Sequence, residues 1–561
     1  DEVEYIINEV PSITSEGISV IDTVNTLSNL NGVLTGQVFM VEERANALFQ
    51  AKTGLSPNGY DIIAGQGAIS FQISLPTNAI SCAQYGLNGD GVTDNLTALT
   101  SLLASSYDVE VDRGKIYLTS GTVTVSTSKK IFGGGEIKGS LTTGNLIEAT
   151  ANDVIFEDIS IDGGAQPITG IKFTGAEDGA IINCRFKQCY ESGIVGNGST
   201  LRARIIGNFL DDCKETGAAQ QNGSIRWRGD NAVINDNVIV DGDTTGISCT
   251  GDYCTIAGNS IKAGSAPESG GIITDGAVGC SITGNSIEGS GVEGIQIGGA
   301  SLDCSVVGNT IKNAEEGGIV VSGTSLRTTV SGNTIVAANA TSTYPYGILI
   351  ESTSQISVTG NTVKFHERGI RLLNNTAAPE HISISGNTLI SQSNTAIYGY
   401  GNCLSITGNI CKGSGAGTSA TGILIDTAID SDNLIVSSNI VDGWTTGLSG
   451  IFTGGTQFRV RDNIFLNNTA DTSQTDETAD IFSGNSTDSG AISGEVTLNG
   501  TSSVTVNTTA LLANDKILLY RKTPSGTEGA AFISARVNGT SFNVKSTNAA
   551  DTSVMTWILD R

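Results

Sequence analysis

The sequence is poor in proline, histidine, methionine and charge. Its 561 residues include only 8 Pro, 2 His and 2 Met, and Asp, Glu, Lys and Arg together make up 15%. The chain is instead rich in Gly, with 72 residues, and in Asn, Ser, Thr and Ile. This composition is typical of a turn-rich and strand-rich protein and disfavours a helical or a disordered chain. We therefore expect an all-β fold.

Long apolar runs and positive charge are also scarce. No stretch of about 18 apolar residues occurs, and the acidic start of the chain lacks the layout of a signal peptide, so we expect no membrane insertion. The net charge of −26 opposes binding to nucleic acid, because the phosphate contacts would be repulsive. An acidic ligand would have to meet local cationic groups.

The ten cysteines are spread along a chain whose length does not require disulfide bonds, and we expect free thiols. Cys254, Cys280 and Cys304 each lie five residues before the Asn of a repeated phrase, which predicts one packed lane of sulfur atoms. No CxxC pair with spaced histidines occurs. We expect no zinc site, no obligatory metal and no cofactor.

A phrase close to Gly-Asn-x-Ile recurs with a period of about 25 residues. A period in the twenties with short strands and no helical pattern is typical of a solenoid. The Gly-Asn pair suits a bend, where left-handed backbone and ladders of side-chain amides are both useful. The repeated Asn residues are Asn208, Asn237, Asn259, Asn285, Asn309, Asn333, Asn361, Asn387, Asn409, Asn439 and Asn463.

A second phrase, a small residue followed by a short Ile- or Leu-rich run, lies between these marks, as in the GIQI that starts at Gly294. Each coil thus carries at least two short strands, which pair with neighbouring coils as parallel strands about 4.8 Å apart. A leucine-rich repeat would need spaced Leu and a helical return, which the sequence lacks. The predicted fold is a right-handed parallel β-helix. Earlier coils are degenerate, with Asp158 and Cys184 expected in the Asn position.

The period divides the chain into four predicted parts. Residues 1–78 are a small N-terminal adaptor, in which Val41 to Lys52 is expected to form an amphipathic helix. Residues 79–468 are the β-helix and 469–492 a polar linker. Residues 493–561 alternate like strands with turn signals, which predicts a small C-terminal β-sandwich-like module.

Two segments resemble a known family. The phrase GDGVTD, followed by a Leu-rich helix that starts at Leu96, is similar to the opening of pectate-lyase-like β-helices, including phage tailspikes. The C-terminal module is similar to one common in tail fibres and tailspikes. The resemblance implies a homotrimer in the virion tail, attached through its N-terminus, that acts outside the cell on a capsule or O-antigen polysaccharide. It assigns Asp90 and Asp94 to turns and capping.

The outer face of one predicted strand carries most of the polar and aromatic side chains. Side chains alternate along a strand, so residues two and four positions after the small residue point outward. The densest neighbourhood of such residues extends from Glu293 to Tyr400. A smaller patch, Arg226 and Arg228 with Asp275, is a candidate site for an anionic sugar, whereas Trp227 is expected to point inward.

Glycoside hydrolysis needs two carboxyl groups, one protonated and one ionised. Residues one coil apart lie about 5 Å apart and residues two coils apart nearly 10 Å, which brackets the retaining and inverting arrangements. Glu293 with Glu316 fits the first case. Glu316 with Glu367 or with Glu351 fits the second.

β-Elimination from a uronic acid is the alternative chemistry, and it needs a cation, a base and an acid. His366, Arg368 and Arg371, together with nearby tyrosines, could supply all three within about three coils. Under either mechanism the aromatic rings suit sugar stacking. The predicted substrate-binding residues of the later coils are Tyr344, Tyr346, Tyr398, Tyr400 and Asp426.

The Asn-Thr-Asp, Gly-Asp-Asp, Gly-His-Gly and Arg-Ile-Lys phrases of polygalacturonases do not occur as a set of catalytic motifs. Hydrolysis is favoured over elimination from the sequence. Two other readings stay open: a receptor-binding spike that holds glycan without cutting it, and a purely structural tail component.

Overall fold

The computed structural model divides into two compact units, Asp1–Ile273 and Thr274–Arg561, and each is described by itself. The boundary lies within β28 (Ile272–Asp275). The structure describes residues 18–75, 78–214, 223–242, 245–263, 270–338, 344–374, 378–414, 420–426, 433–451, 458–474, 481–483, 485–487, 493–508, 511, 513 and 515–560.

The first unit begins with a five-stranded sheet and two short helical segments, α2 (Val24–Ser28) and the 3₁₀ turn η1 (Glu42–Arg44). The predicted helix from Val41 to Lys52 is wrong, because Ala47, Phe49 and Ala51 alternate inward along a strand that pairs antiparallel with its neighbour. The strands, in sheet order, are β1 (Ser19–Ile21), β2 (Val38–Val41), β3 (Ala47–Thr53), β5 (Ile69–Ser74) and β4 (Ile62–Ala64).

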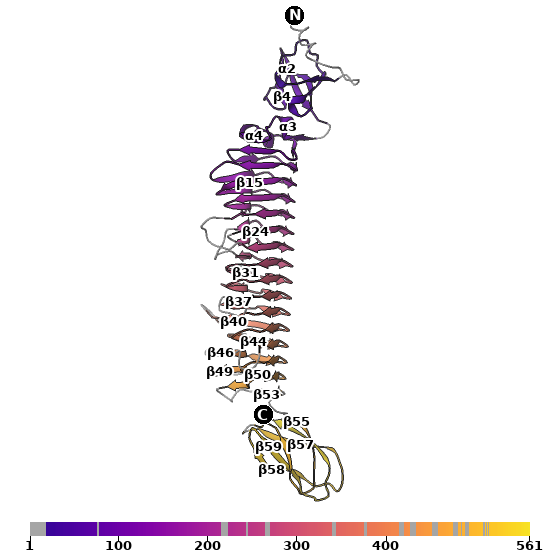
Figure 1. The fold of residues 1–561 in the computed structure, drawn as a ribbon, viewed down its shortest axis with the longest axis vertical. Coiled ribbons are helices and arrows are strands. Elements are labelled where there is room, and N and C mark those ends of the chain that lie inside the picture. The colour runs from indigo at the N-terminus through magenta and orange to yellow at the C-terminus, as the bar shows by residue number, and fades with distance from the viewer. Residues whose placement is uncertain are drawn as a thin grey trace. The chain divides into compact units, whose positions relative to one another are not determined.

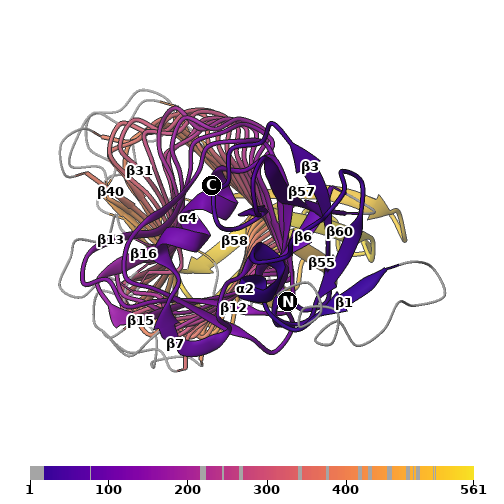
Figure 2. The same cartoon turned by 90° about the horizontal axis from the view of Figure 1, so that it is seen from above.

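The solenoid opens with two helices, α3 (Cys82–Tyr85) and α4 (Leu96–Ala104). Leu99, Leu102 and Leu103 of α4 are fully buried, and Figure 2 shows this helix over the interior of the first coils. Asp90 accepts hydrogen bonds from the backbone of a tight turn, and Asp94 accepts from the backbone N–H of Leu96. The expected turn role of Asp90 is confirmed, whereas the N-cap residue of α4 is Asn95 and Asp94 lies one residue before it.

Each coil contributes one strand to each of three parallel sheets, here called sheets 1, 2 and 3. In the first unit, sheet 1 consists of β10 (Val123–Val125), β13 (Gly144–Ala149), β16 (Ile168–Phe173), β19 (Ser192–Gly196), β22 (Gly223–Trp227) and β25 (Thr245–Cys249).

In the second unit the strands of sheet 1 stack in the same way (Figure 1). They are β31 (Glu293–Gly298), β34 (Gly317–Val321), β37 (Tyr346–Glu351), β40 (Arg368–Leu373), β43 (Thr395–Gly399), β46 (Thr421–Asp426), β49 (Thr446–Ile451) and β52 (Ala470–Gln474). The predicted all-β parallel β-helix is confirmed.

The short strands of sheet 3 show why the repeats fold in this way. In β33 (Thr310–Lys312), β36 (Thr334–Val336), β39 (Thr362–Lys364) and β42 (Thr388–Ile390), the central aliphatic residues pair in register and are at most 1% exposed. Sheet 2 repeats the arrangement in β32 (Ser305–Val307), β35 (Thr329–Ser331), β38 (Ser357–Thr359) and β41 (Glu380–Ser385). The interior is therefore a set of aliphatic columns.

The repeated asparagines form the predicted amide ladder at the bend between sheets 2 and 3. The Nδ2 of Asn333 donates to the Oδ1 of Asn361 and to the carbonyl of Val306, both at 2.9 Å, and its own Oδ1 accepts from Asn309. The residue before each Asn from Asn285 to Asn463 has positive φ, as Gly332 does at 64°. The ladder residues of the second unit are Asn285, Asn309, Asn333, Asn361, Asn387, Asn409, Asn439, Asn463 and Asn485.

Two details of the predicted coils change. Asp158 pairs with Asn183 in the positive-φ position, so Ile159 and not Asp158 occupies the Asn lane; Cys184 lies there as expected, since its N–H donates to Asn208. The coil strands also continue beyond residue 468, through β53 (Ile481–Ser483) and β54 (Ser486–Thr487). In β54 a Thr stands where the repeated phrase has an aliphatic residue, so this further coil was predicted as part of the polar linker.

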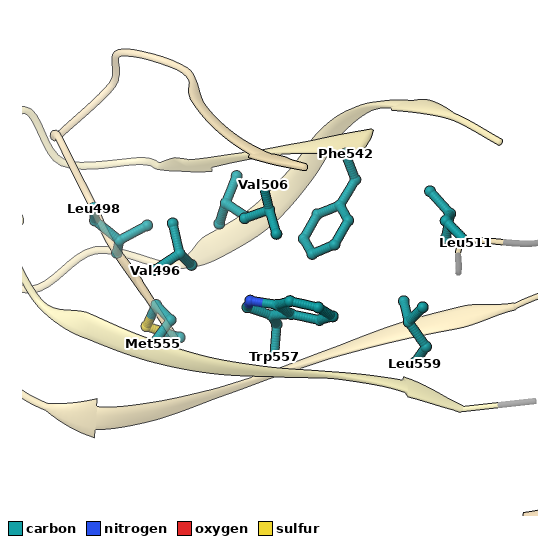
Figure 3. Close-up of a cluster of buried hydrophobic side chains, with 9 residues drawn as sticks. Val496, Leu498, Val506, Leu511, Phe542, Met555, Trp557 and Leu559 are labelled. Atoms are coloured by element: carbon teal, nitrogen blue, oxygen red, sulfur yellow. The ribbon is translucent and has the colours of Figure 1, made fainter. Parts of the chain in front are cut away.

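The C-terminal module consists of two three-stranded antiparallel sheets, as predicted for a small sandwich. Its core is drawn in Figure 3, where the rings of Phe542 and Trp557 meet edge to face at 5.2 Å. The sheets are β55 (Ser493–Thr497), β60 (Val554–Asp560) and β57 (Lys516–Thr523), and β56 (Val504–Asn507), β59 (Ser541–Ser546) and β58 (Ala531–Val537).

Candidate functional site

Strands β31 to β46 of sheet 1 in the second unit carry seven of the fifteen predicted site residues: Glu293, Tyr346, Glu351, Arg368, Arg371, Tyr398 and Asp426. Their register confirms the first outward lane, which consists of Gln296, Val320, Leu349, Arg371, Tyr398 and Leu424. Val320 and Leu349 are only 4% and 8% exposed, so the middle of this lane is an apolar floor. The polar groups lie around that floor.

Glu293 stands at one end of the floor, at the start of β31. Its Oε2 is buried and has no hydrogen-bond partner among the described residues. Burial is the main cause that raises the pKa of this carboxyl, and the charges of Glu316 and Glu351 raise it further. A carboxyl group with these surroundings holds its proton more strongly than an ordinary glutamate and is suited to donate it.

Glu316 and Glu351 differ from Glu293 in exposure. Glu316 is exposed in the turn before β34, and Glu351 is half-buried at the end of β37. The structure brings all three predicted glutamates into one electrostatic neighbourhood, with one carboxyl sheltered and one open to solvent. Burial thus favours the protonated form of Glu293, which is the form that a general acid needs.

Gly317 lies between Glu293 and Tyr346 in the lane that starts the strands. Its φ is not positive, so the backbone does not require glycine, and a Cβ here would meet Cγ2 of Val320 at 2.9 Å. Val320 therefore fills the space that a side chain at this position would need, and glycine is the residue that fits between Glu293 and Tyr346.

Tyr346, Arg371 and Tyr398 form a stack across three successive coils. The Arg371 guanidinium carbon lies 5.1 Å from the centre of the Tyr346 ring and 5.6 Å from that of Tyr398, and Nη1 donates to the Tyr346 hydroxyl at 2.5 Å. The Tyr398 hydroxyl donates to Asp426 at 2.7 Å, and burial, reinforced by this bond, raises the pKa of Tyr398 to about 12. These residues provide flat surfaces and one cation.

Glu367 and Arg368 form an ion pair at 2.8 Å in the adjacent turn, and Asn394 donates to Glu367 at 3.3 Å. Glu367 is thus neutralised by its neighbours and is a weaker candidate for a free base than Glu316, although the two share a lane two coils apart. Asn394 was missed because amides are abundant in every coil. Tyr344 is half-buried in the preceding turn, and the Tyr400 hydroxyl accepts from Asn374 at 3.2 Å.

His366 is not in the groove. It is 1% exposed and occupies an inward corner lane, one coil before the buried Gln392. Its Nδ1 has no partner among the described residues, and burial lowers its pKa to about 4. His366, predicted among the catalytic residues, is therefore out of reach of a ligand on the outer face of sheet 1, because a positive-φ residue, Phe365, turns the chain so that the imidazole faces the core.

The smaller predicted patch comprises residues of both units. Arg226 pairs with Glu191 at 3.2 Å and Arg228 is exposed, whereas Trp227 between them is fully buried as predicted. Asp275 is half-buried at the end of β28 in the second unit.

The cysteines are free and, apart from Cys403, buried, as predicted. A sulfur–sulfur hydrogen bond from Cys280, with burial, raises the pKa of Cys304, as expected for stacked thiols. Within the described part of the second unit, no three His, Cys, Asp or Glu side chains converge closely enough to hold a metal ion. None of the described helices has the length and hydropathy needed to cross a membrane.

Three family models match parts of the chain. Residues 219–344 match the right-handed β-helix region, residues 327–501 match the periplasmic copper-binding protein NosD, and residues 490–559 match the C-terminal domain of K1 capsule-specific polysaccharide lyase. The first two matches cover the coils, and the third covers the C-terminal module. No curated protein matches the chain.

Solved structures share the fold at low sequence identity. The tailspike of Escherichia coli bacteriophage HK620, in complex with a pentasaccharide, is 11% identical over 89% of this chain and 96% of its own, with a TM-score of 0.50. The pre-mature gene product 12 of bacteriophage phi29 is 16% identical over 72% and 58%, also with a TM-score of 0.50. The Dettilon tailspike is 14% identical over 86% and 94%, with a TM-score of 0.42. The chain is thus a right-handed parallel β-helix.

Proposed function

We propose that this chain is a bacteriophage tailspike that binds and depolymerises a bacterial surface polysaccharide, a capsule or an O-antigen, by glycosidic hydrolysis. The observation that carries the proposal is Glu293, a sheltered carboxyl with a raised pKa beside two further glutamates, at the end of the apolar floor formed by Val320 and Leu349. The pentasaccharide complex of the HK620 tailspike and the capsule-lyase domain matched by residues 490–559 support the same substrate class.

In this proposal a sugar ring packs on Tyr346 beside Glu293. Glu293 donates its proton to the glycosidic oxygen as the bond to the anomeric carbon breaks. The carboxylate of Glu316 or Glu351 either attacks the anomeric carbon, giving a glycosyl-enzyme that water then hydrolyses, or takes a proton from the water that attacks this carbon. Val320 and Leu349 form an apolar floor that excludes water. Electrostatic interactions between the carboxyl groups and the sugar are stronger where water is excluded.

Elimination is a second candidate, favoured by the lyase name of the matched C-terminal model and by the Tyr346–Arg371 pair. With Tyr346 as the phenolate, this residue would take the proton on the carbon beside a uronate carboxylate, Arg371 would neutralise that carboxylate, and Glu293 would protonate the leaving glycosidic oxygen. His366 takes no part in this scheme, since its imidazole faces the core.

The wider tailspike assignment is part of the same proposal. It comprises a homotrimer, attachment to the phage tail through the N-terminal sheet, and action on the outer surface of the host as a component of the virion. The matched C-terminal module supports it, because that domain also occurs on a capsule-degrading enzyme.

The test is incubation of the protein with purified capsules and O-antigens from candidate hosts, followed by sizing of the glycan. Hydrolysis predicts new reducing ends without ultraviolet absorbance from a conjugated double bond, whereas elimination predicts both. A Glu316→Gln variant should lose turnover and retain binding. A polymer that is bound but remains intact would reduce the protein to a receptor-binding spike.

A further inference from the structure

Arg371 is a cation without a carboxylate partner on a strongly acidic protein. Arg202, Arg327 and Arg368 each pair with an acidic side chain within 2.8 Å. Among the described residues no such pair forms at Arg371, although the chain has a net charge of −26. Arg371 on the outer face of sheet 1 is therefore a cation that no described carboxylate neutralises.

The immediate surroundings of Arg371 leave part of its guanidinium unused. Nη1 donates to the Tyr346 hydroxyl, but Nε is buried and meets no acceptor among the described residues. Tyr346 and Tyr398, one coil before and one coil after, hold the planar group between them. A buried N–H without an acceptor is unfavourable, and the group that best satisfies this planar fork is a carboxylate.

The nearest acidic side chains are already engaged. The Tyr398 hydroxyl donates to Asp426, and Glu367 is held by Arg368 and Asn394. Glu293, Glu316 and Glu351 gather around β31, β34 and β37, so a negative ligand group is favoured away from them, beside Arg371 on β40. A ligand carboxylate at the partly exposed guanidinium would give Arg371 the acidic partner that no described side chain provides.

We infer that Arg371, between Tyr346 and Tyr398, is a subsite for the carboxylate of an acidic sugar, and hence that the polysaccharide carries carboxylated residues. The inference rests on the proposed function and holds for hydrolysis and elimination alike. The two tyrosines position the sugar ring and the guanidinium recognises its charge. Arg371 is thus a specificity-determining residue.

The experiment uses the full-length Glu293→Gln protein as a non-cutting binder on an array of purified bacterial capsular polysaccharides, acidic and neutral. Acidic polymers should be retained, and an added Arg371→Met change should weaken binding about 10- to 100-fold, as expected for loss of a charge-assisted contact. Arg371→Lys should recover part of the loss. Arg327→Met, which removes an arginine from an exposed corner, should leave binding unchanged.

A second measurement needs no change at Arg371. Chemical reduction of the glycan carboxylates to alcohols should weaken binding as much as Arg371→Met does, and the two changes together should cost no more than either alone. Equal binding of neutral polymers, or indifference to reduction, would overturn the inference and leave the proposed function standing. If the wild-type protein neither binds nor shortens any polymer, the proposed function fails and the inference fails with it.

Discussion

The Asn ladder and the outer face of sheet 1 belong to the same coils but follow opposite rules. In the second unit the ladder repeats one residue type, and each amide both donates and accepts. The outer face changes residue type at every coil and contains groups without partners, such as Oε2 of Glu293 and Nε of Arg371. Repetition with complete hydrogen bonding stabilises the fold, whereas irregularity with unmet hydrogen bonds marks a place where a ligand is expected.

The largest expected effect lies on the irregular face. Glu293→Gln should reduce depolymerisation about 10²- to 10⁴-fold, because it removes the proton donor. The raised pKa of Glu293 means that wild-type activity should fall as the pH rises through that value. Turnover measured by glycan sizing across a pH series, with an exposed neighbour changed as Glu315→Gln for control, tests both statements.

The stability of Glu293→Gln should not fall with its activity. A raised carboxyl pKa in the folded state favours folding only while the group is protonated, and this contribution is lost as the pH rises through the folded-state pKa. At neutral pH the amide should therefore be tolerated at least as well as the carboxyl. A lower melting temperature together with lost turnover would instead assign Glu293 to the framework.

A change in the Asn ladder should lower stability and leave turnover unchanged, which is the reverse of the result expected for Glu293→Gln. Asn333→Ala removes an acceptor for Asn309 and donors to Val306 and Asn361, all of them buried, so the free energy of unfolding should fall by about 3 kcal/mol or more. Thermal or denaturant unfolding measures the loss. Thr334→Ala, which truncates the exposed adjacent residue, should change stability by less than about 0.5 kcal/mol.

Turnover of the Asn333→Ala protein at low temperature should remain near the wild-type value, because repeats contact only their neighbours and a local weakness need not reach the groove. A loss of activity without a loss of stability would contradict the division between ladder and groove.

This contrast also explains what the sequence could predict. The ladder and the aliphatic columns repeat, so spacing alone identified the parallel coils and the outward lane that contains Arg371 and Tyr398. Exposure within that lane does not repeat, since Leu349 is buried although it points outward. In a corner lane of the same coils, His366 turns inward although its neighbours in the sequence are charged. Such placement depends on corner geometry and on covering segments, which no period encodes. The coil at Asn485 was missed for a different reason: Asn485 follows Asn463 by 22 residues, within the range of the repeat, but Thr487 stands where the repeated phrase has an aliphatic residue.

His366 provides an intermediate test, as a buried polar group that is irregular yet inside. The pKa of His366 is near 6.5 in the unfolded chain and about 4 in the folded chain. Between these two pH values the unfolded chain therefore binds a proton at His366 and the folded chain does not. Stability should therefore fall by about 3 kcal/mol as the pH drops from 6.5 to 4. His366→Gln, which copies the buried Gln392 of the next coil, should remove most of this slope in melting temperature against pH.

The control for this test is His381→Gln, at an exposed positive-φ corner where the preceding coil already carries Gln355. It should leave the slope intact. Turnover at pH 7 should be unaffected by His366→Gln, and a loss of turnover in a protein of normal stability would return His366 to the catalytic residues.

The smallest effect on turnover is expected in a lane whose residue type changes from coil to coil but whose polar side chains bond to each other. The positive-φ corner lane that includes Asp303 and Arg327 changes residue type from coil to coil, as the groove does, but Arg327 pairs with Asp303 at 2.6 and 2.8 Å and both side chains are about half exposed. Arg327→Ala should leave turnover unchanged and lower the melting temperature only slightly, and only at low salt, because exposed ion pairs are screened. A large loss of turnover would show that any lane whose residue type changes from coil to coil can be functional. Unchanged turnover, the expected result, would show that such a lane forms a site only where its polar groups have no hydrogen-bond partner in the protein and can bind a ligand.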